Sequence, residues 1–162
     1  MSFPSEVPAA GPGTYRFRAD VEQAGPAVFT APSDAVGGGY GLFESAAVPG
    51  RWGAIPHYHQ GFTEAFWVIS GRLGVLSGRE WRVLGSGDFA HVPVNGVHGF
   101  HAVGDELARF LILFVPGAPR EHYFRGLAEL FARGAPPEEI DAFALSCDQV
   151  NLRDWQNDPV PS

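Results

Sequence analysis

The stretch Pro56–Gly71, PHYHQGFTEAFWVISG, places His57 and His59 two residues apart and Glu64 five residues further on. Successive side chains of a β-strand alternate between its faces, so residues that are two apart point the same way. His57 and His59 therefore converge on one point, and a loop signal at 60–63 predicts that Glu64 opens a second strand beside them. Two neutral imidazoles and a carboxylate form a ligand set that borderline transition metals favour. One further ligand from elsewhere in the chain would complete a metal site.

The composition indicates one domain that is built from short strands. With 162 residues the chain is long enough to bury a substantial core without disulfides. Glycine and proline contribute 21 and 14 of these residues. Such an abundance favours many tight turns between short strands over a helical bundle.

The charge balance and the termini argue against nucleic acid and membranes as partners. Lys and Arg number 11 against 18 Asp and Glu, and the formal net charge of -7 repels phosphate groups. Cys147 is the single cysteine, which excludes an intramolecular disulfide and fits a reducing compartment. The N-terminal residues lack the basic and apolar regions of a secretory signal, and the apolar run Phe110–Val115 is too short to cross a bilayer. We therefore expect a soluble, cytoplasmic protein.

Strand patterns precede two helical patterns along the chain. The run Ala108–Val115 is continuously apolar and suits a central strand that is buried on both faces. After Pro119, apolar residues recur at helical spacing up to Gly134, and Pro137 with two following glutamates opens a second helix. We expect both helices to pack outside the strands. The other expected strands lie at residues 15–18, 27–30 and 40–48 and in the two arms of a hairpin at 72–84.

A second stretch supplies the fourth ligand candidate. Residues 85–100, GSGDFAHVPVNGVHGF, predict a turn, a short apolar strand, a second turn at 93–96 and a further strand that begins near His98. Together the two stretches resemble the two signature motifs of the cupin superfamily. The first motif has His-x-His, three or four residues, Glu, six residues and Gly, and the second has Gly, Pro and His at set separations. The residues that match are His57, His59, Glu64 and Gly71 in the first motif and Gly87, Pro93 and His98 in the second.

Three positions depart from these motifs, and none of them is a ligand position. Arg51 stands where the first motif opens with Gly, and Ala102 stands where the second has Asn. Asn95 replaces a Gly of the second motif, but Asn tolerates the left-handed conformation that such a turn needs.

The resemblance implies an all-β fold, an antiparallel jelly-roll barrel with one or two C-terminal helices packed outside. It also implies a metal centre inside the barrel, held by His57, His59, Glu64 and His98. Jelly-roll barrels fill their interior with side chains from alternate positions, which agrees with the strand patterns above. The expected organisation is a flexible arm at 1–13, a barrel at 14–118, a helical segment at 119–150 and a tail at 151–162.

Three segments, 64–71, 87–100 and 120–127, are similar to those of single-domain quercetin 2,3-dioxygenase-like proteins of bacteria. This likeness implies oxygenation of a flavonol or another aromatic enol by dioxygen. The substrate hydroxyl would bind one divalent ion of Fe, Ni, Mn, Cu or Zn, and Glu64 would act as the base that removes its proton. Phe66 and Phe100 share strand faces with Glu64 and His98, so they are candidates for an aromatic substrate wall or for ordinary core.

Two other functions fit the same ligand set. One is a cyclase or isomerase that uses a redox-inactive ion to polarise a polyketide or sugar carbonyl. The other is a cupin that binds a small molecule without catalysis. The ligand set cannot name the metal, because several divalent ions suit it.

Two further sets of predictions concern the other histidines and the outer faces of the strands. His101 lies three residues after His98, and an odd spacing on a strand should point it away from the metal. His122 lies on an expected outer helix. The sequence leaves open whether His91 lines the pocket. Trp67 lies on the strand face opposite Glu64, and a large apolar side chain on an outer face needs a cover. Either a homodimer or the C-terminal helices can provide that cover.

Overall fold

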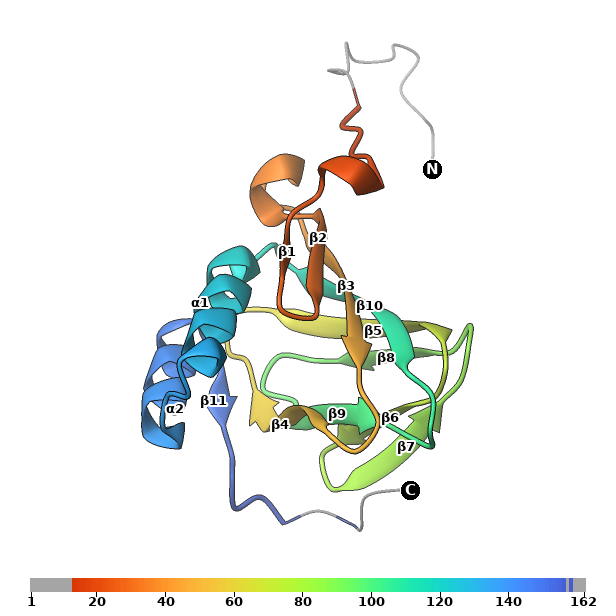
Figure 1. Cartoon of the computed structure of the whole chain (residues 1–162), viewed down its shortest axis with the longest axis vertical. Coiled ribbons are helices and arrows are strands. Elements are labelled where there is room, and N and C mark those ends of the chain that lie inside the picture. Colours follow the sequence, from red (N-terminus) through yellow and green to blue (C-terminus); the bar gives the residue numbers. More distant parts are fainter. Residues whose placement is uncertain (1–12, 157, 159–162) are drawn as a thin grey trace, which may run out of the picture.

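The computed structural model describes residues 13–156 and 158, so the arm expected at 1–13 lies outside the described residues except for Gly13. In this part of the chain, strands form two antiparallel sheets that face each other, with two helices at one end (Figure 1). The first sheet has the strand order β1-β2-β3-β10-β5-β8 and the second has the order β11-β4-β9-β6-β7. The strands are β1 (Gln23–Ala24), β2 (Ala27–Ala31), β3 (Gly41–Ala47), β4 (Trp52–Tyr58), β5 (Thr63–Ser70), β6 (Leu73–Ser77), β7 (Glu80–Leu84), β8 (Phe89–Val92), β9 (His98–Ala102), β10 (Ala108–Val115) and β11 (Val150–Asn151).

The order of the strands is that of a jelly roll, as the sequence predicts. From β3 to β6 the chain crosses from one sheet to the other at each step, and β9 and β10 then insert between strands that are already in place. As a result β10 pairs with both β3 and β5, and β9 pairs with both β4 and β6. Among the described residues the strands form two sheets and not one closed ring, so side-chain contacts and not backbone ladders join the layers.

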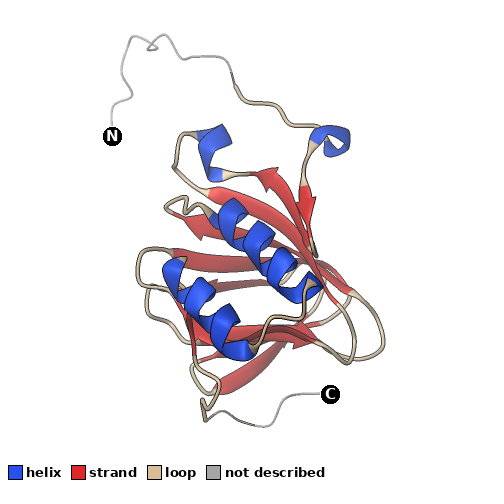
Figure 2. Cartoon of the chain, turned by 60° about the vertical axis from the view of Figure 1, so that its left-hand side comes forward, coloured by secondary structure: helices blue, strands red, loops and turns tan. Residues whose placement is uncertain are grey.

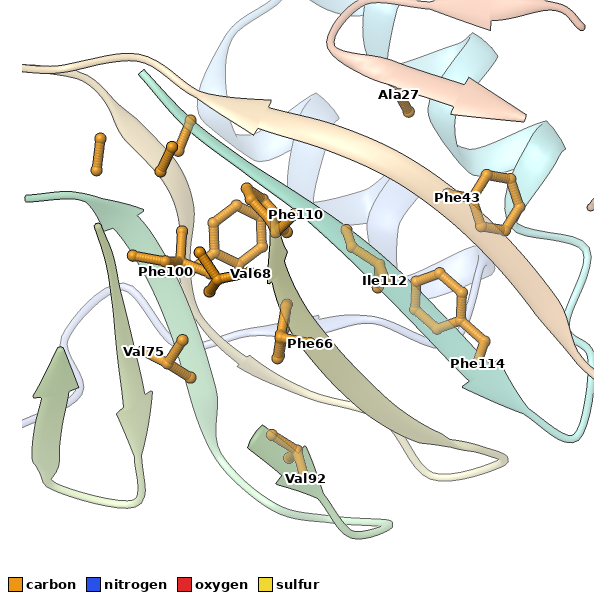
Figure 3. Close-up of a cluster of buried hydrophobic side chains, with 14 of the residues drawn as sticks. Ala27, Phe43, Phe66, Val68, Val75, Val92, Phe100, Phe110, Ile112 and Phe114 are labelled. Atoms are coloured by element: carbon orange, nitrogen blue, oxygen red, sulfur yellow. The ribbon is translucent and has the colours of Figure 1, made fainter. Parts of the chain in front are cut away.

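The core lies between the two sheets and is dominated by phenylalanine. Burial alternates along β3, as expected for a strand with one face toward the core. Phe66, Phe100 and Phe110 come from three strands and gather between the sheets (Figure 3). The ring centroid of Phe100 lies 5.6 Å from that of Phe66 and 5.1 Å from that of Phe110, in edge-to-face geometry. Each such ring stabilises the fold by about 1.5–3 kcal/mol through burial.

The two predicted helices are α1 (Arg120–Ala132) and α2 (Pro137–Ser146), which lie across one side of the strands (Figure 2). α2 begins with proline and carries two glutamates in its first turn, where the helix dipole favours negative charge. α1 inserts Phe124 against Phe43 of β3 at a centroid distance of 5.1 Å, so it closes an open end of the strand layers. No helix in the described part of the chain is both long and apolar enough to cross a bilayer.

Two strand predictions need correction. The predicted strand at 15–18 is absent, because Tyr15 and Phe17 are exposed and have no sheet to pack on, and a short 3-10 helix occupies Arg18–Asp20. β10 is central, as predicted, but only one of its faces is fully buried. Neither helix covers its outer face, so Arg109 and Val115 remain partly exposed.

Two motif positions need the left-handed backbone region. Gly71 has φ of 75°, and an added Cβ would lie 2.4 Å from the carbonyl oxygen of Leu107, so glycine is required there on two grounds. Asn95 has φ of 63°, which confirms that asparagine fills the position of the usual glycine.

Candidate metal centre

The structure brings together the four residues that the two motifs single out. His57 lies near the end of β4, His59 follows that strand, Glu64 is in β5 and His98 begins β9. The register of β4 and β9 sets His57 directly opposite His98. Their exposed fractions are 3, 2, 4 and 1 % in chain order, and one ligand atom from each lies within 4.8 Å of all the others.

Backbone carbonyls orient all three imidazole rings. A carbonyl oxygen can only accept a hydrogen bond, so each Nδ1 carries a proton and donates it. Each Nε2 of a neutral ring then keeps its lone pair and faces the centre of the group. Histidine ligands in metal sites are commonly oriented in this way, by an acceptor on the ring nitrogen that does not bind the metal. The acceptors are the carbonyl oxygens of Ile55 for His57 (2.7 Å), Asp148 for His59 (2.6 Å) and Gly96 for His98 (2.9 Å).

The electrostatics of the group fit a divalent cation. Burial and the neighbouring His98 ring hold the pKa of His57 well below its ordinary value, so this ring is neutral. Burial raises the pKa of Glu64, but His98 and His59 outweigh burial and hold that pKa well below its ordinary value. Oε2 of Glu64 lies 3.0 Å from Nε2 of both His59 and His98. An ionised carboxylate and three imidazole rings that converge in a buried space suit a transition-metal ion between them.

The other histidines lie elsewhere. His101 points to the other face of its sheet, where it lies against Gly74 and meets the ring of Trp81 edge-on at 4.8 Å. His91 is exposed in β8, and His122 is exposed on α1. The predicted orientation of His101 and the predicted helical position of His122 are therefore confirmed, and His91 takes no part in the group.

The group opens onto a cavity of about 590 Å³ between the two sheets and α1. His57 and Glu64 form part of its wall, and most of the remaining wall is apolar. A volume of this size is typical of sites for small organic molecules. Phe100 lines the cavity, whereas Phe66 is fully buried behind it in the core. Other apolar residues of the wall are Ala47, Ile112, Phe114, Phe124 and Leu127.

Besides Ser45 and Arg51, three polar residues that the sequence did not predict line this cavity. Arg120, Tyr123 and Gln149 are buried and line the same wall. Arg120 donates to the carbonyl of Cys147 (3.1 Å) and to Oε1 of Gln149 (2.8 Å). Burial lowers the pKa of Arg120 and raises the pKa of Tyr123. The three-residue spacing of Arg120 and Tyr123 was a signal, because it places both side chains on one face of a helix.

Asp148 is a further residue whose role the sequence did not reveal. It adopts a positive φ of 56° after α2. Its carboxylate accepts the backbone N–H groups of Gln60 and Gly61 at 3.0 and 2.7 Å, while its carbonyl accepts Nδ1–H of His59. The chain then enters β11, which pairs with β4 and sets Asn151 opposite His57. The C-terminal segment therefore helps to hold two of the donors.

Comparison with known proteins agrees with the fold and the ligand group. The model of the cupin domain matches residues 45–115, a segment that contains all four donors. Quercetin 2,3-dioxygenase of Bacillus subtilis (strain 168) is 32% identical over 75 residues, which are 46% of this chain and 22% of that protein. The chain thus spans about a fifth of the length of this curated relative.

Solved structures share the fold at low sequence identity. KdgF from Halomonas sp. is 20% identical with a TM-score of 0.54, and the alignment covers 65% of this chain and 94% of that one. TT1209 from Thermus thermophilus is 19% identical with a TM-score of 0.53, over 64% of this chain and 98% of that one. The jelly-roll topology, the two motifs and the matched domain lead to one conclusion: this chain belongs to the cupin superfamily.

Proposed function

We propose that the protein is a metal-dependent dioxygenase that acts on an aromatic enol of the flavonol type. The observation that carries the proposal is a buried group of three histidines and one glutamate that opens onto a largely apolar cavity of about 590 Å³. The similarity to a quercetin 2,3-dioxygenase supports this substrate class.

The ligand residues would hold one divalent ion of Fe, Ni, Mn or Cu, which supplies Lewis acidity to a bound hydroxyl and redox chemistry toward dioxygen. The neutral ring of His57 leaves the charge of such an ion undiminished. Glu64 is ionised and lines the cavity, so its carboxylate can accept the hydroxyl proton of the substrate. General base catalysis of this kind contributes roughly 10²–10⁴ in rate.

The aromatic wall would position the planar part of the substrate and exclude water. Phe100, Phe114 and Phe124 lie around the cavity and come from β9, β10 and α1. Aromatic rings pack edge-on or offset against other rings, and such pairs add about 0.5–1.5 kcal/mol beyond burial. Phe66 supports Phe100 from the core side and contributes to the wall only through it.

Oxygen uptake tests the proposal. Metal-free protein is loaded separately with Fe, Ni, Mn, Cu or Zn, and each form is given a panel of flavonols in an oxygen electrode. We expect uptake with at least one redox-active ion, and its loss in Glu64→Gln after equal metal loading. His91→Ala is the control, because His91 is exposed outside the cavity.

Two results would assign a different function to the protein. Conversion of a carbonyl substrate by the zinc form without oxygen uptake would replace the dioxygenase with a cyclase or isomerase. Tight binding of small molecules without turnover by any metal form would instead indicate a binding cupin.

A further inference from the structure

Arg120 is a buried cation that forms no ion pair with the described residues. Its exposed fraction is 3 %, although its guanidinium group is charged at any ordinary pH. None of the ion pairs in the described part of the chain includes Arg120. Buried charges are normally paired, because removal from water is costly for an ion. The carboxylate of Glu64 attracts the guanidinium through space, but no carboxylate of the described residues bonds to it directly, so the environment of Arg120 favours an anionic ligand.

The hydrogen bonds of Arg120 lead to the same conclusion. A guanidinium has five N–H donors, and the side chain donates to one carbonyl, that of Cys147, and to one amide oxygen, that of Gln149. Nε is buried and has no hydrogen-bond partner. Aromatic rings hold the guanidinium in place from several sides, but a ring face is a weak substitute for an anion. Their centroids lie 3.8 Å (Tyr123), 5.2 Å (Phe114), 5.5 Å (Phe62) and 5.7 Å (Phe124) from its central carbon.

The position of Arg120 relates this unmatched charge to the metal centre. Arg120 lines the same cavity as His57 and Glu64, and Glu64 is the one acidic residue among the described residues of that wall. The carboxylate of Glu64 faces His59 and His98, so it is committed to the ligand group. A divalent ion in that group would add positive charge to the cavity. A ligand that fills the cavity would therefore meet positive charge at the ligand group and at the buried Arg120, while Arg51 lines the same cavity as an exposed side chain.

We propose that Arg120 binds a carboxylate of the substrate, so that the substrate is an aromatic enol that also carries an acid group. The enol hydroxyl would lie at the ligand group and the carboxylate at the guanidinium, with the aromatic body between them against the phenylalanine wall. The enol part of this inference rests on the proposed function, and the acid part rests on the environment of Arg120. Arginine suits this role because its planar donors match the two oxygens of a carboxylate.

A matched pair of probes tests the inference by binding alone. 6-Hydroxy-2-naphthoate and 6-hydroxy-2-naphthamide have nearly the same shape and differ in charge. Isothermal titration of the metal-free protein should show at least about tenfold tighter binding of the acid, which corresponds to about 1.4 kcal/mol. Arg120→Gln should remove this preference and leave the affinity for the amide within about twofold.

A control variant separates a local effect from a general effect of charge. Arg125 lies on the same helix but pairs with Glu22 outside the cavity. Arg125→Gln should keep the preference for the acid, and Arg120→Lys should keep part of it. Equal affinity for both probes in the wild type would overturn the inference, as would a preference that persists in Arg120→Gln.

A purely structural role for Arg120 gives a different result. Arg120→Gln would then weaken both probes equally and lower the thermal unfolding temperature, which would also overturn the inference. If this variant does not fold, an NMR titration of the ¹⁵N-labelled wild type tests the inference through the Nε–H resonance of Arg120. This resonance should shift with the naphthoate and not with the naphthamide, and an unmoved resonance counts against the inference. None of these measurements depends on oxygen uptake, so failure of the proposed reaction is seen separately.

Discussion

Replacement of His98 by alanine tests the metal centre most directly. His98 is the donor that comes from the second motif, and it lies 34 residues after Glu64 in the sequence but 3.0 Å from it in the structure. Its Nδ1–H donates to Gly96, so its Nε2 faces the group. The variant removes one of four donors and leaves the phenylalanine core between the sheets unchanged. We expect a folded protein with weak metal binding.

The loss of metal affinity should be visible in thermal unfolding. Loss of a residue that only orients a ligand already weakens metal affinity by about 10–100-fold, so loss of the ligand itself should cost at least about 100-fold. With metal at about 100 times the wild-type Kd, binding stabilises the wild type by about 2.7 kcal/mol and the variant by about 0.4 kcal/mol. At about 2–4 °C per kcal/mol for a domain of this size, metal should raise Tm by about 5–11 °C in the wild type and by about 1–2 °C in the variant.

The assay combines metal analysis after dialysis with thermal unfolding in the presence and absence of the ion. His101→Ala is the matched control, because His101 lies on the same strand but faces Gly74 and Trp81. It should keep full metal content and the full rise in Tm. Stoichiometric metal in His98→Ala with an undiminished Tm rise would refute the ligand assignment. Loss of metal in His101→Ala would refute the assigned strand register.

Three further predictions concern stability and assembly. Arg109 and Arg18 hold the pKa of Glu44 below its ordinary value, so Glu44→Gln should cost up to about 1 kcal/mol in urea unfolding at pH 7. This cost should fade below about pH 4.5, as the native carboxylate of Glu44 becomes protonated. Glu80→Gln, which removes the exposed ion pair of Glu80 with Arg82, should show no such cost. Gly71→Ala should destabilise by about 1–3 kcal/mol more than Gly50→Ala, because both have positive φ but only Gly71 is crowded. Trp67 is 48 % exposed in the described part of the chain. We therefore predict a homodimer by light scattering that Trp67→Glu converts to a monomer, and a monomeric wild type would contradict this.

Much of the fold was predictable because local patterns agree with the tertiary contacts. The hairpin arms at β6 and β7, the strand at β10 and both helices follow from alternation, helical period and turn residues. The failed strand at 15–18 shows the limit of such patterns. Strand composition is realised only where a neighbour offers hydrogen bonds and an apolar face, and Tyr15 and Phe17 have neither buried packing nor a strand.

The candidate site, too, was predictable from the sequence only in part. Strand alternation places His57 and His59 on one face, and the resemblance to the two cupin motifs added Glu64 and His98 to the expected donor set. The spacing did not reveal which carbonyls orient the rings, and one of these belongs to Asp148, 89 residues after His59. Arg120 and Tyr123 were missed for the same reason, since the sequence shows that they share a helix face but not what that face covers.

The sequence by itself indicated the donor set, through its resemblance to two cupin motifs, and most of the strands and both helices, because these follow from patterns of residues that are neighbours along the chain. Only the tertiary structure decided that α1 closes the cavity, that Phe100 and not Phe66 lines it, and that the guanidinium of Arg120 lies buried in its wall. These features arise where two sheets and a helix meet, and the depth at which a side chain is buried depends on every element around it.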